Sequence, residues 1–141
     1  MKRLIGCALI ILCIVSGEVL AEGFKPYPRA KIDEAATTAG SKVQIGTQVK
    51  VYVTNDGFDK VSAFYKGRYK EYMMPAKPPK LDSGQSVQWG FYIMDDGKDL
   101  GNSKYWLKIQ HPYIGSTKAD GRKIIFSDVR DVTVIEVVRK Q

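Results

Sequence analysis

The chain has 141 residues, with 22 lysines and arginines, 15 aspartates and glutamates and a formal net charge of +7. This length suits one ordinary domain that forms its own hydrophobic core. One histidine and two cysteines, Cys7 and Cys13, are too few and too badly placed for a transition-metal site, which needs clustered His or Cys ligands.

The N-terminus has the order of a cleavable secretory signal peptide. Lys2 and Arg3 begin the chain, and an apolar run covers residues 4–15. Val19 and Ala21 occupy the two positions that a signal peptidase reads. The sequence therefore predicts cleavage after Ala21 and a periplasmic or secreted location.

Two other functions for this segment fit less well. A membrane span needs roughly 20 apolar residues, and the run 4–15 is shorter. In a lipoprotein signal the modified cysteine follows the apolar region, whereas here that region follows Cys7. Cys13 is preceded by Leu12, where a small residue is expected. We therefore expect residues 1–21 to be removed and 22–141 to form a single cysteine-free domain that does not span a membrane.

The predicted mature domain remains basic. Removal of Lys2, Arg3 and Glu18 leaves 20 basic and 14 acidic residues, a net charge of +6. Such an excess favours anionic partners, for example an anionic envelope component, and another envelope protein is a second possible partner. It is also an ordinary charge for a soluble small domain. The chain has no run of five consecutive basic residues, which argues against a nucleic-acid partner.

The first half of the mature chain predicts a lead-in, a short helix and a strand. Residues 22–30 contain two prolines and predict an extended segment. The alanine-rich residues 31–39 predict a short helix that ends at Gly40. Apolar side chains then recur at every second position over residues 43–54, which is typical of a strand with one buried face.

A second, amphipathic helix is predicted from Phe58 onward. Residues 54–56 offer side-chain oxygens for its N-cap, and Pro75 is expected to end it. Its apolar side chains follow each other at steps of three and four residues. They are Phe58, Val61, Phe64, Tyr65, Tyr69 and Tyr72.

The second half of the chain predicts short strands joined by turns. Residues 75–84 predict a loop, and alternation predicts strands at 87–93 and 105–109 around a turn at 95–99. A loop from Pro112 to Gly121 and a strand at 123–126 are expected next. The last segment, 129–138, is apolar on both faces, as a central strand would be.

This order of elements predicts an α+β fold, because the strands are joined by turns rather than helices. We expect an antiparallel sheet of about four to five strands. One main amphipathic helix is expected to pack on one face, with a short N-terminal helix in addition.

Two segments resemble a known group of proteins. Tyr27-Pro28-Arg29-Ala30-Lys31 and the helix Phe58–Lys66 are similar to elements of bacterial exported small-domain proteins and lipoproteins. Those proteins carry a Tyr-Pro-x-Ala-Lys element and a later Asp-Lys-Val-x-x-Phe-Tyr-Lys helix, with glycine where this chain has Arg29. The resemblance covers about the first half of the mature chain. It implies an exported α+β domain and no particular activity.

The candidate ligand-binding residues lie in the second half of the chain. Trp106 alternates with the apolar residues around it and is expected to face outward beside Lys108. An exposed aromatic ring between cations can stack on a sugar or lie at a membrane surface; alternatively, Trp106 covers the second face of the sheet. The full candidate set is Trp106, Lys108, His111, Tyr113 and Arg122.

No motif predicts an enzyme, a metal or a cofactor. The alternative to a binding domain is a small hydrolase that uses His111, because serines and aspartates are available as partners, but no Gly-x-Ser-x-Gly is present. Asp95, Asp96 and Asp99 lack the spacing of a calcium loop and fit a turn better. We therefore expect a domain that binds an anionic ligand or an envelope partner without catalysis, without a metal and without a cofactor.

Overall fold

The computed structural model describes residues 23–141, so the predicted signal peptide at 1–21 lies outside the described residues. The described chain is an α+β fold built on an antiparallel sheet, as predicted, but with more strands than the expected four to five. Its elements follow in the order β1 (Lys31–Ile32), α1 (Glu34–Val43), β2 (Thr47–Thr54), α2 (Phe58–Lys66), β3 (Lys70–Tyr72), β4 (Gln88–Ile93), β5 (Tyr105–His111), β6 (Tyr113–Asp120), β7 (Lys123–Arg130) and β8 (Thr133–Lys140).

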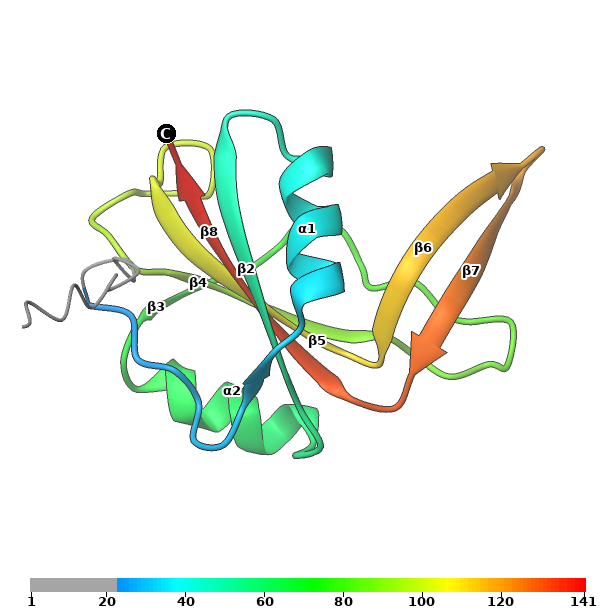
Figure 1. The fold of residues 1–141 in the computed structure, drawn as a ribbon, viewed down its shortest axis with the longest axis horizontal. Coiled ribbons are helices and arrows are strands. Elements are labelled where there is room, and N and C mark those ends of the chain that lie inside the picture. Colours follow the sequence, from blue (N-terminus) through cyan, green and yellow to red (C-terminus); the bar gives the residue numbers. More distant parts are fainter. Residues whose placement is uncertain (1–22) are drawn as a thin grey trace, which may run out of the picture.

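Six of the strands form one sheet in the order β1-β2-β8-β5-β4-β3, with every neighbouring pair antiparallel. The last strand, β8, lies between β2 and β5. This position confirms the prediction that the final apolar segment forms a central strand. The remaining pair, β6 and β7, forms a two-stranded arm that projects away from the sheet (Figure 1).

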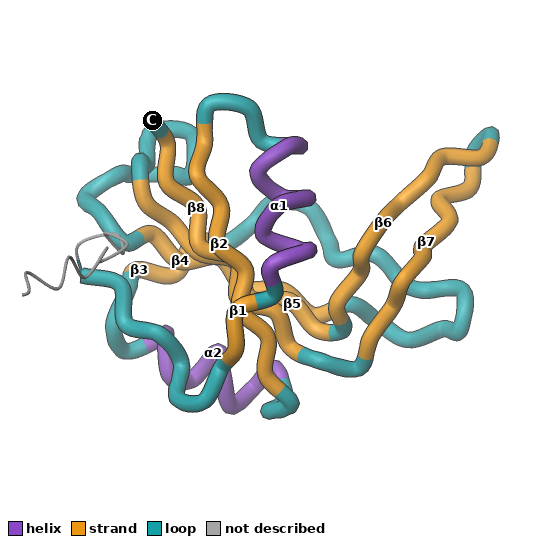
Figure 2. Tube along the Cα trace, viewed as in Figure 1, coloured by secondary structure: helices purple, strands orange, loops and turns teal. Residues whose placement is uncertain are grey.

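The two helices pack on opposite faces of the sheet. Strand side chains alternate between the faces, so Leu107 and Ile109 lie on the α2 side and Trp106 and Lys108 on the α1 side. The α2 face carries the larger core and includes Tyr65, which is fully buried. The smaller α1 core joins Ala36 to valines of β2 and β8. Figure 2 shows the helices on either side of the strands.

Asp33 explains where α1 begins. It is the N-cap residue, and its Oδ1 accepts a hydrogen bond from the backbone N of Ala36 at 2.9 Å. The expected end at Gly40 is wrong, because the helix continues to Val43. Gly40 instead lets α1 approach the sheet closely, since a Cβ at this position would lie only 2.9 Å from Cγ1 of Val49.

The predicted extent of the second helix is also wrong. It ends at Lys66 with Gly67 as its C-cap, and residues 70–72 form β3 at the edge of the sheet. The aromatic spacing continues through Tyr69 and Tyr72, but Gly67 ends the helix before either residue. The expected cap at residues 54–56 is not formed either, because Gly57 is the N-cap and makes no side-chain hydrogen bond there.

The loop predicted from Pro112 to Gly121 is in fact the first strand of the arm. β6 and β7 are joined by Gly121 and Arg122, between the paired residues Asp120 and Lys123. Gly121 has φ 59°, as the first central residue of a type II′ hairpin turn requires. β6 is mostly small and polar, so its sequence carries little of the apolar alternation that marks a strand.

Asp95 holds together the turn between β4 and β5. Its carboxylate accepts hydrogen bonds from Ser103 Oγ at 2.7 Å and from the backbone N of Gly97, Lys104 and Tyr105 at 3.0, 2.6 and 3.1 Å. Burial opposes its ionisation, but these bonds prevail and lower the pKa of Asp95 to about 2. The prediction of a turn at residues 95–99 is confirmed.

Candidate functional site

A groove of about 670 Å³ lies between α1 and the arm, over the face of the sheet that α1 covers only in part. α1 packs on β2 and β8 and leaves the β5 and β4 part of this face without a helix. Phe91, Trp106, Lys108, Val134 and Glu136 come from the sheet and form the floor. The volume lies within the roughly 300–1,000 Å³ typical of small-molecule sites.

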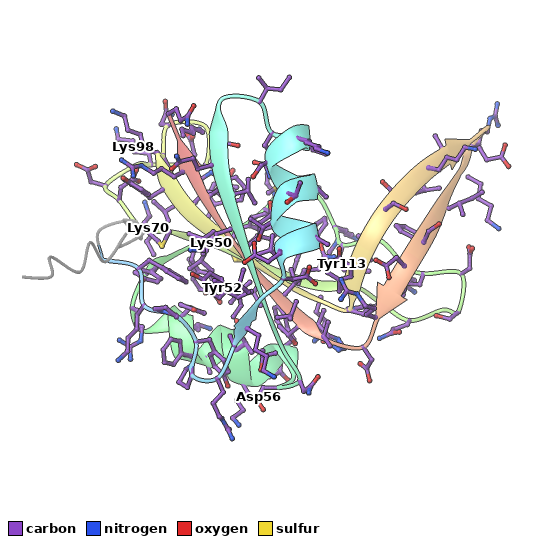
Figure 3. All side chains as sticks on the ribbon, viewed as in Figure 1. Lys50, Tyr52, Asp56, Lys70, Lys98 and Tyr113 are labelled. Carbon is purple, nitrogen blue, oxygen red and sulfur yellow. The ribbon has the colours of Figure 1, made fainter. Side chains whose placement is uncertain are left out.

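The walls of the groove come from elements far apart in the sequence. Ala39, Gly40 and Val43 of α1 form one wall, and Thr117 and Phe126 of the arm belong to the other. Tyr113 lies at the base of the arm, next to the sheet (Figure 3). Alternation along the strands places the floor residues on one face of the sheet. The walls lie beside that face because the chain folds α1 and the arm over it.

A polar link holds the two walls together. Arg130, at the end of the arm, donates from both terminal nitrogens to Oδ2 of Asp33 at 3.1 Å. The same guanidinium lies 3.9 Å from the ring centre of Tyr113. The hydrogen bond from Ala36 N and the contact with Arg130 lower the pKa of Asp33 against the effect of burial. Asp33 therefore begins α1 and also fixes the base of the arm.

Among residues 23–141, Lys108 is the only lysine that lines the groove, and its surroundings are largely apolar. Its register neighbours are Phe91 on β4 and Glu136 on β8. The Lys108 Nζ lies 6.0 Å from the ring centre of Trp89, on the β4 side, and no carboxylate of residues 23–141 lies within 4 Å of it. Burial lowers the pKa of the Lys108 ammonium, and the nearby charge of Glu136 opposes that effect.

Glu136 is held on the other side of the groove floor. Its Oε1 accepts a hydrogen bond from Gln44 Nε2 at 2.7 Å, and Gln44 is the C-cap of α1. The Glu136 carboxylate is thus bound toward α1, whereas Lys108 lies toward β4. Nearby, the buried Nε1–H of Trp106 has no hydrogen-bond acceptor within the described part of the chain. The floor therefore contains one ammonium without an ion-pair partner and one buried N–H group without a protein acceptor.

The structure brings together three of the five candidate residues. Trp106, Lys108 and Tyr113 all line the groove. Arg122 lies in the exposed turn at the tip of the arm. His111 is not a groove residue; its Nε2 lies 2.9 Å from Oδ1 of Asp131, which is almost fully exposed.

The His111 site has part of what a hydrolase requires. A carboxylate is within hydrogen-bond distance of the ring, but among residues 23–141 no hydroxyl group hydrogen-bonds to it. Ser103, one of the available serines, is buried and donates to Asp95 and to the carbonyl oxygen of Tyr105. In the described chain the His111 ring is thus paired with a carboxylate and with no hydroxyl group of the kind that a histidine base activates.

Sequence reasoning missed Phe91, Phe126, Glu136 and Gln44. Phe91 and Glu136 lie on the same face as Lys108, and alternation in their strands was a usable signal once the strand order was known. Phe126 belongs to the arm and Gln44 to the end of α1. No local sequence pattern predicts where these two elements lie relative to the sheet.

Comparisons of the chain with protein-family models, curated proteins and solved structures gave no match.

Within residues 23–141 no helix is long and apolar enough to cross a membrane. The same residues contain no group of three or more His, Cys, Asp or Glu side chains arranged to hold a metal ion.

Proposed function

We propose that the protein is an extracytoplasmic binding domain whose groove takes a small molecule with an apolar body and one anionic group. The observation that carries this proposal is the Lys108 ammonium, which lies among apolar groove residues without an ion-pair partner in the described chain. Burying an unpaired charge is costly, and an anion that enters the groove would remove that cost.

The shape and lining of the groove support the rest of the ligand description. Phe91, Trp106 and Val134 on the floor, with Phe126 on the wall, supply apolar surface for a hydrocarbon or aromatic body. Lys108 lies on the β4 side and Glu136 is bound to Gln44 on the α1 side, so the anion would approach Lys108 from β4.

Decanoate is a suitable probe, with decanol as its uncharged counterpart. We expect decanoate to bind saturably in isothermal titration calorimetry and decanol to bind at least tenfold more weakly. The two tryptophans of the chain, Trp89 and Trp106, give a second signal through their fluorescence, since both lie on the groove face.

Lys108→Met tests the charge, and Lys104→Met is the matched control. Lys104 is exposed and lies four residues earlier, outside the groove. Lys108→Met should weaken decanoate binding at least tenfold and leave decanol binding unchanged, and Lys104→Met should change neither. Equal affinity for the acid and the alcohol, or equal losses in the two variants, would show that the groove does not select an anion through Lys108.

A further inference from the structure

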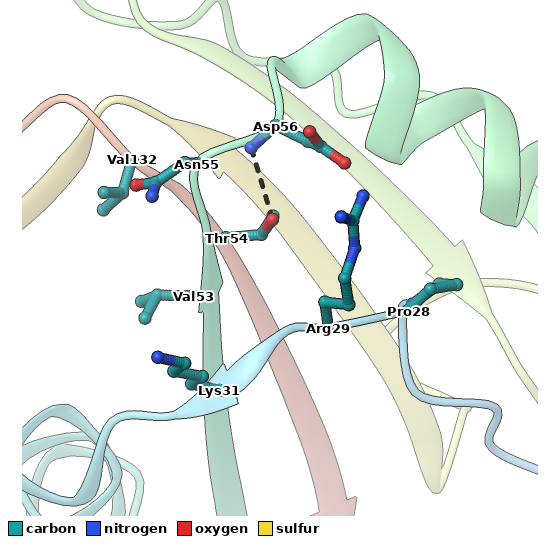
Figure 4. Close-up of a pocket in the computed structure, with 8 residues that line it drawn as sticks. All are labelled: Pro28, Arg29, Lys31, Val53, Thr54, Asn55, Asp56 and Val132. Atoms are coloured by element: carbon teal, nitrogen blue, oxygen red, sulfur yellow. Dashed lines mark hydrogen bonds between the residues drawn. The ribbon is translucent and has the colours of Figure 1, made fainter.

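A second recess, of about 360 Å³, lies where β1 meets the end of β2, and it shares no residue with the groove. Its lining comes from the lead-in to β1, from β2 and the turn after it, and from the segment before β8. The residues are Pro28, Arg29, Lys31, Val53, Thr54, Asn55, Asp56 and Val132, which Figure 4 shows together.

Arg29 adopts a backbone conformation that favours glycine. Its φ is 62°, in the left-handed region that a residue with a long side chain rarely occupies. The chain is fixed on both sides of it: Tyr27 is buried, with its carbonyl oxygen bonded to Ala30 N at 3.1 Å, and Lys31 pairs with Val53 of β2. The Arg29 side chain itself is exposed.

This conformation destabilises the fold, and the Arg29 side chain compensates for it only through the longer-range attraction between its charge and Asp56. Arg29 has no ion pair or hydrogen bond through its side chain in the described structure. Strained residues of this kind cluster at functional sites. The turn fixes the point from which the Arg29 side chain leaves the backbone, at the edge of the recess.

The charges of the recess leave its cations available. Lys31, like Arg29, has no carboxylate within 4 Å in residues 23–141. Among the described residues, Asp56 is the one acidic residue of the lining, and its Oδ2 already accepts from the Tyr27 hydroxyl at 2.7 Å and lies 3.1 Å from Lys60 Nζ. The Tyr27 hydroxyl and Lys60 lower the pKa of Asp56, and the charge of Arg29 adds to their effect. Lys60 therefore offsets most of the Asp56 charge, and Arg29 and Lys31 leave the recess with a net positive charge.

We propose that this recess binds a phosphate group, with Arg29 as the main contact and Lys31 as a second positive charge. The planar guanidinium can donate two parallel hydrogen bonds to phosphate oxygens, and the ammonium acts as a compact point charge. Thr54 and Asn55 add a hydroxyl and an amide to the lining. The same chemistry serves free phosphate and a phosphate ester. This site is independent of the groove, because Lys108 takes no part in it.

Arg29→Gly tests the proposal and separates binding from folding. Glycine adopts the observed φ without strain, so the variant should melt at the same temperature as the wild-type chain or above it. Titration with inorganic phosphate, followed by calorimetry at constant ionic strength, should show a dissociation constant raised at least tenfold. Lys31→Met should weaken binding by a smaller factor.

Arg122→Gln is the matched control, because it removes the same charge from an exposed turn outside the recess. It should leave phosphate binding unchanged. Equal losses in Arg122→Gln and Arg29→Gly would overturn the proposal, since the effect would then come from net charge. It would also fail if the wild-type chain gave no saturable signal, or if Arg29→Gly melted at a clearly lower temperature.

Glycerol 3-phosphate, titrated in parallel, distinguishes the two sources of the phosphate group. Tighter binding of the ester than of inorganic phosphate would assign the site to phosphate esters. Equal or weaker binding would assign it to the free ion. Either result supports a phosphate site, and neither depends on whether decanoate binds in the groove.

Discussion

Leu107 and Lys108 are neighbours on β5, but their side chains lie on opposite faces of the sheet and meet different surroundings. Leu107 is fully buried in the α2 core. On that face the tyrosine hydroxyls are satisfied: Tyr65 donates to the carbonyl oxygen of Lys25 at 3.0 Å, and Tyr92 lies 2.6 Å from Ser62 Oγ. Lys108, on the groove face, lies beside a tryptophan N–H that lacks an acceptor.

The difference separates a face of the sheet that is closed by packing from a face that is left partly open. The α2 face is closed by aromatic rings from three segments, with Phe24, Phe64 and Tyr69 all in ring contact with Tyr65. The groove face is covered by α1 over β2 and β8 only. A face that is packed and satisfied supports the fold, and a face with unpaired donors and open volume can bind a ligand.

The largest contrast should come from the two neighbours on β5. Leu107→Ala should lower the free energy of unfolding by about 2–5 kcal/mol, because it leaves a cavity in a closed core. Lys108→Ala should change it by less than about 1 kcal/mol, since the ammonium has no ion-pair partner to lose and only part of the stem is packed. Urea denaturation of both variants measures this. Similar losses in the two would contradict the contrast between the faces.

A substitution of Asp95 should destabilise both faces of the sheet together, because Asp95 fixes the turn between β4 and β5. Asp95→Asn should cost about 2 kcal/mol, since an amide NH₂ then faces backbone N–H donors. The pKa of Asp95 falls from 3.8 to about 2 on folding, so its contribution is fully present above about pH 4 and is lost as the pH falls toward 2.

Acid titration of unfolding checks this dependence. The wild-type chain should lose more stability than Asp95→Asn between about pH 4 and pH 2, and the two should run parallel above that range. A constant difference across all pH values would mean that the Asp95 charge does not stabilise the turn.

The smallest effect should be confined to the groove side. Arg130→Met removes the link from the arm to Asp33 and should cost about 1 kcal/mol, since the guanidinium is partly exposed. Backbone amides of β6 and β7 should then exchange with deuterium several times faster, whereas those of α2 should not change. Faster exchange throughout the protein would show that the arm is not a separate unit of stability.

The sequence predicted the elements whose side chains repeat regularly. Alternation found β2, β4 and β5, apolar residues on both faces found the central position of β8, and three- and four-residue spacing found the start of α2. In the arm, the predicted strand at 123–126 lies in β7, whereas β6 escaped prediction because Ser116, Thr117 and Lys118 carry no apolar alternation. The end of α2 was placed too late, because the aromatic spacing crosses Gly67 without a break.

The candidate site was predicted in part, for a related reason. Trp106 and Lys108 were found because their strand alternates clearly, and Tyr113 because it follows closely. Their joint surroundings depend on α1 and the arm, which meet through Asp33 and Arg130, residues 97 positions apart. A pattern read along one segment holds no information about such a contact.

The position of β8 has a consequence for how the protein is made. Its eight residues, Thr133–Lys140, come last among the strands, yet β8 pairs with β2 on one side and β5 on the other. Until residues 133–140 have left the ribosome, those two strands have no neighbour to join them. Assembly of the sheet therefore waits for this segment, and a chain cut short before Thr133 would leave the sheet divided between β2 and β5.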